Sequence, residues 1–293
     1  MTRATVERAL DAHSGREIRE AAGLFGPGTV SWRVDREAIV LAGGSCALLM
    51  QAAHPVVAAG VAEHSTYASD PFGRLMRTLS SSFDVAFGSV ATARTAIRRV
   101  NAIHARVRGQ MPSGGRYSAL DPEALLWVHA TLVDTALRVY DRFVERLSPA
   151  EMQAYHREAG EVALMLGVPS SLLPDDLSEL RAWMADMQDA GRVRVTPQAR
   201  AIAATVLYPD RRVPKVAWDA AHLVSIATLP GDLRRQYGIG WSPARERGVE
   251  RLAAASRAVL PRLPGILHHV PRAREAERRV AQVAEFEVDG PSR

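Results

Sequence analysis

The apolar positions along the chain follow the helical period over most of its length. After Asp121, apolar residues recur three or four positions apart, at Leu125, Val128, Leu132, Ala136, Val139 and Phe143. This spacing places side chains on one face of an α-helix. Alternating runs that would indicate strands are nearly absent, and no repeat of roughly 20 to 50 residues indicates a solenoid. The pattern therefore predicts an irregular, all-α fold.

The starts of these helices are marked by a capping oxygen followed by proline. The oxygen accepts a hydrogen bond from a free backbone amide, and proline is tolerated at the first helical position because its nitrogen needs no partner there. Four dipeptides show this pattern: Asp70-Pro71, Asp121-Pro122, Ser148-Pro149 and Thr196-Pro197. Glu151 can also bond the amide of Ser148, which predicts a capping box.

Glycines and loops separate the helices but do not divide the chain. Because glycine is favoured just beyond a helix end, we expect helices to end near Gly88, Gly109, Gly167 and Gly191. Loops are predicted at 111–117 and 168–176, and the charged segment 272–279 predicts an exposed helix before a frayed tail. No linker rich in glycine, proline or serine is found, so residues 1–293 are predicted to form a single domain.

The composition is that of a protein with a large core and no disulfide framework. Of the 293 residues, 47% are hydrophobic, and Cys46 is the only cysteine, which we interpret as a packing residue. The N-terminus lacks the apolar stretch of a secretory signal, so a cytoplasmic location is predicted. The most apolar segment, Ala38–Val61, is interrupted by Gln51, His54 and Pro55. We interpret it as a buried core helix, and no integral membrane segment is expected.

The positive charge of the chain does not indicate a nucleic-acid partner. The formal net charge is +5, but Lys215 is the only lysine and the arginines are spread along the sequence. No glycine-rich or aromatic-interleaved RNA-binding signature accompanies them. A solvated surface explains these charges better than a binding patch does.

Several common enzyme motifs are absent from the sequence. There is no Glu-x-x-His pair for a di-iron site, no His-Glu-x-x-His zinc helix, and no Walker loop or dinucleotide fingerprint. The segment Gly43–Ala47 approaches a nucleophile elbow but lacks its final glycine and follows no predicted strand. Close helix packing explains its small residues better.

One histidine combines with an apolar helix face in a way that suits a metal ligand. Ile97, Val100, His104 and Val107 are spaced by three, four and three residues, so one imidazole lies within an apolar stripe. A single helix-borne histidine in an apolar pocket is what a haem site requires, because the macrocycle supplies the other four nitrogen ligands. A histidine on such a face is more often structural, so the pattern alone leaves both interpretations open.

Upstream of this histidine, the helix that follows Asp70 carries a polar stripe. Arg74, Arg77 and Thr78 lie at i, i+3 and i+4, so they project from one side. Without further information, an ordinary solvated face is the simpler interpretation.

Further segments resemble a known family in consistent order from about Gly26 to about Met187. They are Gly26-Pro27-Gly28, Trp32-Arg33, Leu48–Pro55, His64-Ser65, Asp70–Leu75, Thr78, Phe87-Gly88, Ile103–Gly109, Tyr117-Ser118-Ala119 and Trp127–Thr131. In these segments the chain resembles the haem-dependent oxygenases that include the rubber-cleaving latex-clearing proteins and the oxygenase of mycophenolic acid biosynthesis. The C-terminal third matches less specifically.

The resemblance implies a globin-like helical core, at about 26–187, with peripheral helices at about 188–280. It implies that the core holds haem b through one proximal histidine, matched here by His104. Arg74, Arg77 and Thr78 match an Arg-x-x-Lys-Thr arrangement on the distal side and are the expected catalytic residues. Arg77 replaces the lysine of that arrangement, and because arginine stays protonated, it is not expected to ligate iron.

Other matched residues are expected to support the cofactor. Arg74, Arg108 and His54 are expected to contact haem, and His54 is the next candidate for the iron ligand. His64 and His129 also match family segments, and supporting or structural roles are expected for them.

These observations lead to three functional hypotheses. The first is a b-type haem oxygenase, or a peroxide-using oxidase, that acts on a small, largely apolar organic molecule. The second is a non-catalytic haem carrier or gas sensor, because a globin-like core serves binding as readily as catalysis. The third is a helical scaffold that keeps the fold without haem. The sequence does not determine the substrate, the oxidant or the oligomeric state.

Overall fold

The computed structural model describes residues 15–66, 69–111, 114–210 and 212–288. The N-terminal residues on which the expected cytoplasmic location depends lie outside these ranges. Within the described ranges the elements are helices except for one two-stranded hairpin and an isolated β-bridge between Glu37 and His269, so the predicted all-α fold is confirmed. A globin-like core, implied by the resemblance, stays a prediction.

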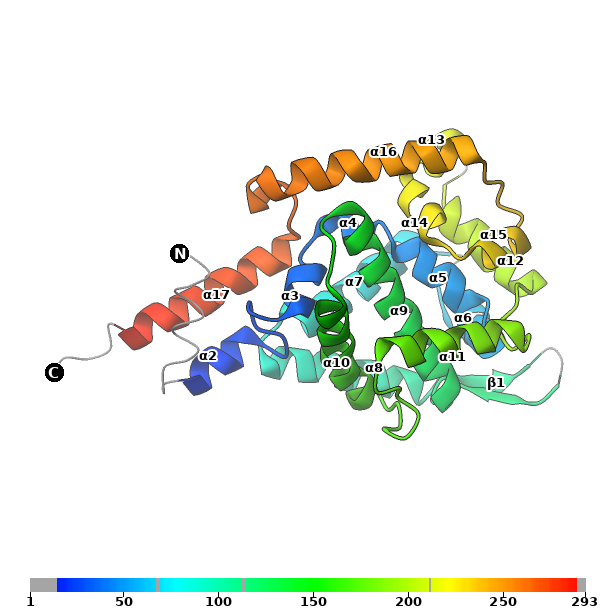
Figure 1. Ribbon diagram of the computed structural model, residues 1–293. Helices are drawn as coiled ribbons and strands as arrows, with labels where there is room; N and C mark the ends of the chain where they lie inside the picture. Colours follow the sequence, from blue (N-terminus) through cyan, green and yellow to red (C-terminus); the bar gives the residue numbers. More distant parts are fainter. Residues whose placement is uncertain (1–14, 67–68, 112–113, 211, 289–293) are drawn as a thin grey trace.

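The described elements follow one another in three groups along the chain (Figure 1). The first group contains α2 (Gly15–Ala22), α3 (Val30–Asp35), α4 (Ala38–Leu41), α5 (Gly44–Ala52) and α6 (Pro55–His64). The second contains α7 (Pro71–Phe87), α8 (Val90–His104), β1 (Arg108–Gln110), β2 (Arg116–Ser118), α9 (Pro122–Phe143), α10 (Pro149–Met165) and α11 (Leu177–Asp189). The third contains α12 (Pro197–Leu207), α13 (Lys215–Ala221), α14 (Leu223–Thr228), α15 (Gly231–Gln236), α16 (Pro243–Val259), the 3₁₀ turns η1 (Leu260–Arg262) and η2 (Gly265–Leu267), and α17 (Pro271–Val288).

The capping signals placed the helix starts correctly. Each of the four predicted caps accepts a hydrogen bond from a backbone amide in the first turn of α7, α9, α10 or α12. The capping box between Ser148 and Glu151 is also formed. These starts were predictable because capping is a local interaction between residues close in sequence.

Three of the four glycine signals are confirmed, and the fourth is wrong. Gly88 caps α7, while Gly167 and Gly191 follow α10 and α11 with positive φ. Gly109 instead lies in β1 opposite Tyr117. A Cβ at Gly109 would lie 2.8 Å from the Tyr117 ring, so close packing explains this glycine. Part of the predicted 111–117 loop is therefore strand β2, although residues 112–113 are not described.

The apolar segment Ala38–Val61 does not form the single core helix that we predicted. It is divided among α4, α5 and α6, and the chain bends by 106° between Ala38–Ala52 and Pro55–His64. Proline after His54 starts a new helix because it cannot continue the previous one. No single described helix has the length and apolar character needed to span a bilayer, and only this bent pair meets both criteria together.

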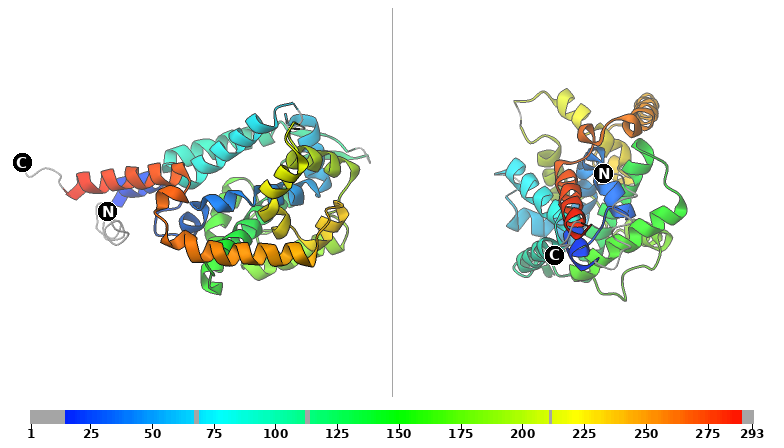
Figure 2. Two further views of the ribbon diagram at one scale, coloured as in Figure 1. Left: turned by 90° about the horizontal axis from the view of Figure 1, so that it is seen from above. Right: turned by 90° about the vertical axis from the view of Figure 1, so that its left-hand side faces the viewer.

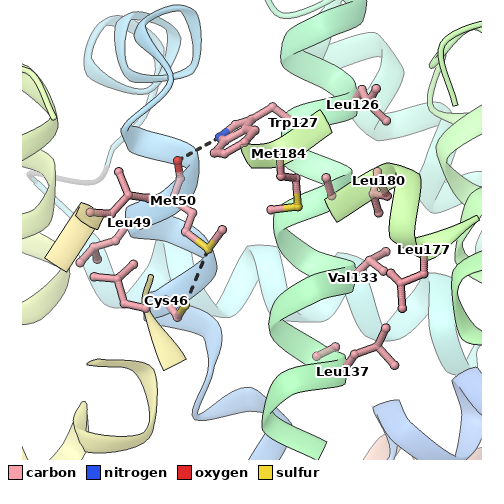
Figure 3. Close-up of a cluster of buried hydrophobic side chains, with 14 of the residues drawn as sticks. Cys46, Leu49, Met50, Leu126, Trp127, Val133, Leu137, Leu177, Leu180 and Met184 are labelled. Atoms are coloured by element: carbon pink, nitrogen blue, oxygen red, sulfur yellow. Dashed lines mark hydrogen bonds between the residues drawn. The ribbon is translucent and has the colours of Figure 1, made fainter. Parts of the chain in front are cut away.

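The largest apolar core forms where α5, α9 and α11 pack together (Figure 3). Met50 of α5 lies beside Trp127 of α9, and Leu177, Leu180 and Met184 of α11 pack against the other side of α9. The Trp127 indole Nε1 donates to the Met50 carbonyl at 2.9 Å. The predicted apolar stripe of α9 is buried except at Leu132, which is 53% exposed, and at the half-buried Val128.

The C-terminal helix α17 is only partly the exposed helix that was predicted. It projects from one end of the molecule beside α2 (Figure 2). Ala273, Ala276 and Val280 are fully buried, and Arg279 donates hydrogen bonds to the carbonyls of Ala21 and Phe87. The charged 272–279 segment therefore buries one face, which composition alone could not indicate. The tail beyond 288 lies outside the described residues.

Candidate functional site

The helix pair α7 and α8 carries most of the expected site residues. The two helices are joined by a short turn at Gly88 and Ser89 and pack against each other. Two helices connected this way run antiparallel, so the start of α7 and the end of α8 lie at the same end of the pair. Arg74 is in the first turns of α7 and His104 is the last residue of α8. We call this region the His104 end.

His104 is half-buried and has an unsatisfied ring nitrogen. Its Nδ1 is buried and has no hydrogen-bond partner within the described part of the chain. Burial lowers the pKa of His104 below its usual value of 6.5. The imidazole is therefore neutral at neutral pH and offers the lone pair that a metal ligand requires.

Arg74 is a cation held partly away from solvent at the same end. It is half-buried, and its Nε donates to the Ser65 hydroxyl at 3.2 Å. Burial and the nearby charge of Arg77 lower the pKa of Arg74, but a guanidinium remains protonated at any physiological pH. Among the described residues this is the only hydrogen bond that the Arg74 side chain makes.

Arg77 and Thr78 lie on the same helix but face solvent. The Arg77 side chain is 61% exposed, and it donates to Asp70 at 3.1 Å and to Thr66 at 2.9 Å. Asp70 also caps α7 through the amide of Gly73. Thr78 donates to the carbonyl of Arg74, one turn earlier. Of the three expected distal residues, only Arg74 is withdrawn from solvent, and Arg77 holds the start of α7.

The β-hairpin follows His104 directly and is anchored to the end of α6. The Val107 amide donates to the His104 carbonyl at 3.1 Å, and Arg108 then begins β1. Buried Tyr117 of β2 donates to Glu63 Oε2 at 2.5 Å and meets the ring of His64 edge to face. These contacts fix the hairpin relative to α6 and α8.

A shallow groove runs beside this hairpin. Its volume is about 390 Å³, and it is lined by Val56, Arg108, Arg116, Tyr117, Ser118, Leu120 and Asp121. Arg108 and Arg116 are both exposed. The groove therefore brings together two cations that follow His104 by 4 and 12 positions in sequence.

Large apolar side chains are also exposed close to His104 in sequence or on the first turns of α7. They are Phe72, Leu75 and Met76 of α7 and Ile103 of α8. Of the 15 large apolar side chains that are exposed among the described residues, these four share one helix pair.

The other expected histidines are packed into the protein. His54 is buried against Trp127, and its Nε2 lies 3.8 Å from Glu123. Burial and the neighbouring His156 lower the pKa of His129 to about 4. The structure does not bring either ring into hydrogen-bond contact with Arg74 or His104.

One cluster of chemically reactive groups was missed by the sequence reasoning. Glu37, His268 and His269 place three possible metal-ligand atoms within 4.8 Å of one another, and we call them the Glu37 cluster. Glu37 and His268 are 231 positions apart, so no local spacing signals this arrangement. The adjacent histidines were the only available hint in the sequence.

Comparison with known proteins identifies the family. Residues 32–258 match the family described as "ER-bound oxygenase mpaB/B'/Rubber oxygenase, catalytic domain". The chain belongs to this family, which confirms the resemblance and defines it as a protein with an oxygenase catalytic domain.

Two curated relatives come from mycobacteria and are themselves described as uncharacterized. One is from Mycobacterium bovis and one from Mycobacterium tuberculosis. Each is 26% identical over 217 residues, which cover 72% of this chain and 84% of the relative. No solved structure shows a significant match to the chain.

Proposed function

We propose that the protein is a b-type haem-dependent oxygenase, or a peroxide-using oxidase, with His104 as the protein ligand to iron. Its substrate is a small, largely apolar organic molecule. The observation that carries this proposal is a neutral, half-buried imidazole with an unsatisfied nitrogen, at one end of a helix pair in an oxygenase catalytic domain.

The residues of the His104 end fit haem b in three respects. His104 can supply one imidazole nitrogen, which is sufficient because the macrocycle supplies the other four. Arg108 and Arg116 can pair with the two carboxylates of the macrocycle. The exposed apolar side chain of Ile103, next to His104, can cover part of its apolar surface. When bound, haem would supply the redox chemistry needed to activate dioxygen or peroxide.

Arg74 is the residue best placed to act on developing negative charge. Its Nε is fixed by Ser65, so the guanidinium is oriented before any ligand arrives. A preorganised donor stabilises an anionic transition state without reorganisation at the moment of reaction. Thr78 and Arg77 would then act by stabilising the first turns of α7. Thr78 donates to the carbonyl of Arg74, and Arg77 donates to Asp70. His54 would support the site from the start of α6.

The experiment is a pyridine haemochrome assay with spectra of the ferric and dithionite-reduced protein. We expect about one non-covalent haem b per chain in the wild type. His104→Gly should lose most of it, and added imidazole should restore the spectrum because it replaces the missing ligand. His129→Gln is the matched control and should keep its haem. A colourless wild type that takes up no added haemin would contradict the cofactor.

Retention of a wild-type spectrum in His104→Gly would contradict the ligand alone, and His54→Gly would then be tested. A carrier or gas sensor would use the same site without turnover. Multiple-turnover oxygen or peroxide consumption in the presence of apolar alkenes distinguishes the enzyme from that alternative.

A further inference from the structure

The Glu37 cluster lies far from His104. Val270, next to His269, packs with Phe87 at the turn between α7 and α8, whereas His104 is at the other end of α8. The 15 residues of α8 span about 22 Å at about 1.5 Å per residue. The cluster is therefore separate from the proposed haem site.

The three side chains are withdrawn from solvent and converge on one point. Glu37 is buried, and each histidine side chain is only 11% exposed. His268 Nδ1 lies 2.7 Å from Glu37 Oε2, and His269 Nε2 lies 3.3 Å from Glu37 Oε1. In a tetrahedral site with bonds of about 2.05 Å, ligand atoms lie about 3.3 Å apart. The three ligand atoms all lie within 4.8 Å of one another, so modest side-chain rotations would bring them to that spacing.

The hydrogen bonds of His268 direct its Nδ1 toward the carboxylate of Glu37. Its Nε2 lies 3.2 Å from the Leu263 carbonyl, which can only accept, so Nε2 carries a proton. The other ring nitrogen, Nδ1, lies 2.7 Å from Glu37 Oε2, and a cation between these two atoms, either a proton or a metal ion, would bind both. The Nε2–H contact to a carbonyl is also the usual outer contact of a metal-bound histidine.

His269 is oriented just as firmly, and its inner nitrogen lies 3.3 Å from Glu37 Oε1. Its Nε2 is buried and makes no well-aligned hydrogen bond to the described residues. The ring lies against Gly265, where a Cβ would be 2.6 Å from Nδ1. The backbones are fixed as well, because Ala38 donates to the His268 carbonyl and Val270 donates to the Arg36 carbonyl, both at 2.8 Å. The donor atoms are therefore preorganised.

We propose that Glu37, His268 and His269 bind a divalent transition metal, Zn²⁺ in the first instance. Two imidazoles and one carboxylate are a common ligand set for this ion, with a fourth position left for water. The bound ion would join the α16–α17 connection to the α3–α4 connection and hold α17 on the core. Arg36 lies 3.9 Å from Glu37 but also 3.6 Å from Glu277, so the carboxylate is not its only partner.

The test uses the full-length protein after dialysis against EDTA, with Zn²⁺ as the probe. Elemental analysis after re-addition and gel filtration should find one Zn²⁺ per chain, counted separately from haem iron. Thermal unfolding should shift upward with Zn²⁺. His269→Gln should weaken the affinity by more than about a hundredfold, because a direct ligand is lost. His222→Gln is the matched control, since that half-buried histidine bonds Ser45 instead, and it should bind like the wild type.

Two further measurements test metal binding independently if the His269 variant folds poorly. Arg36→Gln keeps all three donor atoms and removes a nearby cation, so it should bind Zn²⁺ more tightly than the wild type. Co²⁺ should give the visible absorption bands of a tetrahedral site in the wild type. The proposal would be overturned if the wild type bound no more Zn²⁺ than a His268→Gln/His269→Gln variant and also gave no Co²⁺ bands. The cluster would then be a proton-bridged carboxylate–histidine clamp.

Discussion

The two ends of the α7–α8 pair hold histidines in opposite circumstances. At one end, a ring nitrogen of His104 has no partner among the described residues, and exposed apolar side chains and partly buried Arg74 lie close to it in the chain or on the adjoining helix. At the other end, His268 and His269 are enclosed with a carboxylate and fixed by backbone hydrogen bonds. The comparison indicates that a half-buried histidine with an unsatisfied nitrogen suits an exchangeable ligand or cofactor, whereas an enclosed histidine held against a carboxylate suits a structural role.

The largest effect should come from breaking the enclosed end. Glu37→Gln leaves two histidines without their carboxylate in a buried setting, and removing one partner of a buried charged cluster typically costs about 3 kcal/mol or more. Urea unfolding should show this loss in the free energy of unfolding, while haem content stays at the wild-type level. Loss of haem with unchanged stability would reverse the roles that we assign to the two ends.

His129 provides a third case for the comparison, because it lies at neither end of the helix pair and burial keeps it neutral. The pKa of His129 is lowered to about 4 from its usual 6.5. The unfolded chain therefore binds a proton at higher pH than the folded one. Stability from this group is fully present above about pH 6.5 and decreases as pH falls toward 4, by up to about 3 kcal/mol. His129→Leu should flatten that part of the pH profile in urea unfolding, and an unchanged slope would show that His129 is not responsible.

A smaller effect should separate Arg74 from Arg77 at the His104 end. If Arg74 faces the iron, Arg74→Ala should weaken azide binding to the ferric protein, because a charge-assisted hydrogen bond is worth roughly 1.5–3 kcal/mol, or about tenfold to a hundredfold. Arg77→Ala should change it by less than about threefold, since that side chain faces solvent. Spectrophotometric titration measures both. Equal effects would place both arginines at the same distance from the ligand.

The smallest effect concerns the hairpin that follows His104. Tyr117→Phe removes the hydrogen bond to Glu63 and keeps the ring that packs on Gly109. The expected cost is about 1 kcal/mol in the free energy of unfolding. Haem affinity should change by less than the stability does, because Tyr117 positions the hairpin only. Differential scanning calorimetry and haemin titration would test this, and a larger loss of haem affinity than of stability would assign Tyr117 to the site itself.

Local signals in the sequence predicted more of the helices than of their packing. Caps and most glycine ends were correct because they depend on residues within one turn of each other. The Ala38–Val61 segment was wrong as one helix because hydropathy does not record the break before Pro55. The exposure of Leu132 was also missed, since helical spacing gives a face but not what covers it.

The residues of the candidate site also fall into those that the sequence identified and those that only the fold revealed. His104 and Arg74 were identified from spacing and from the resemblance, and each lies on a predicted helix. Arg77 is exposed and Arg74 is half-buried. This difference depends on how α6 and the segment before α7 pack against the two side chains. The Glu37 cluster joins residues 231 positions apart, so only the folded chain reveals it.

The sequence by itself determined the helical class, the capped helix starts and membership of an oxygenase family, because period, caps and ordered motifs are properties of neighbouring residues. Tertiary structure alone decided which polar groups became buried and which met a partner. Burial and pairing depend on elements that pack from distant parts of the chain. For this reason the unpartnered nitrogen of His104 and the enclosed ligands around Glu37 became visible only in the fold.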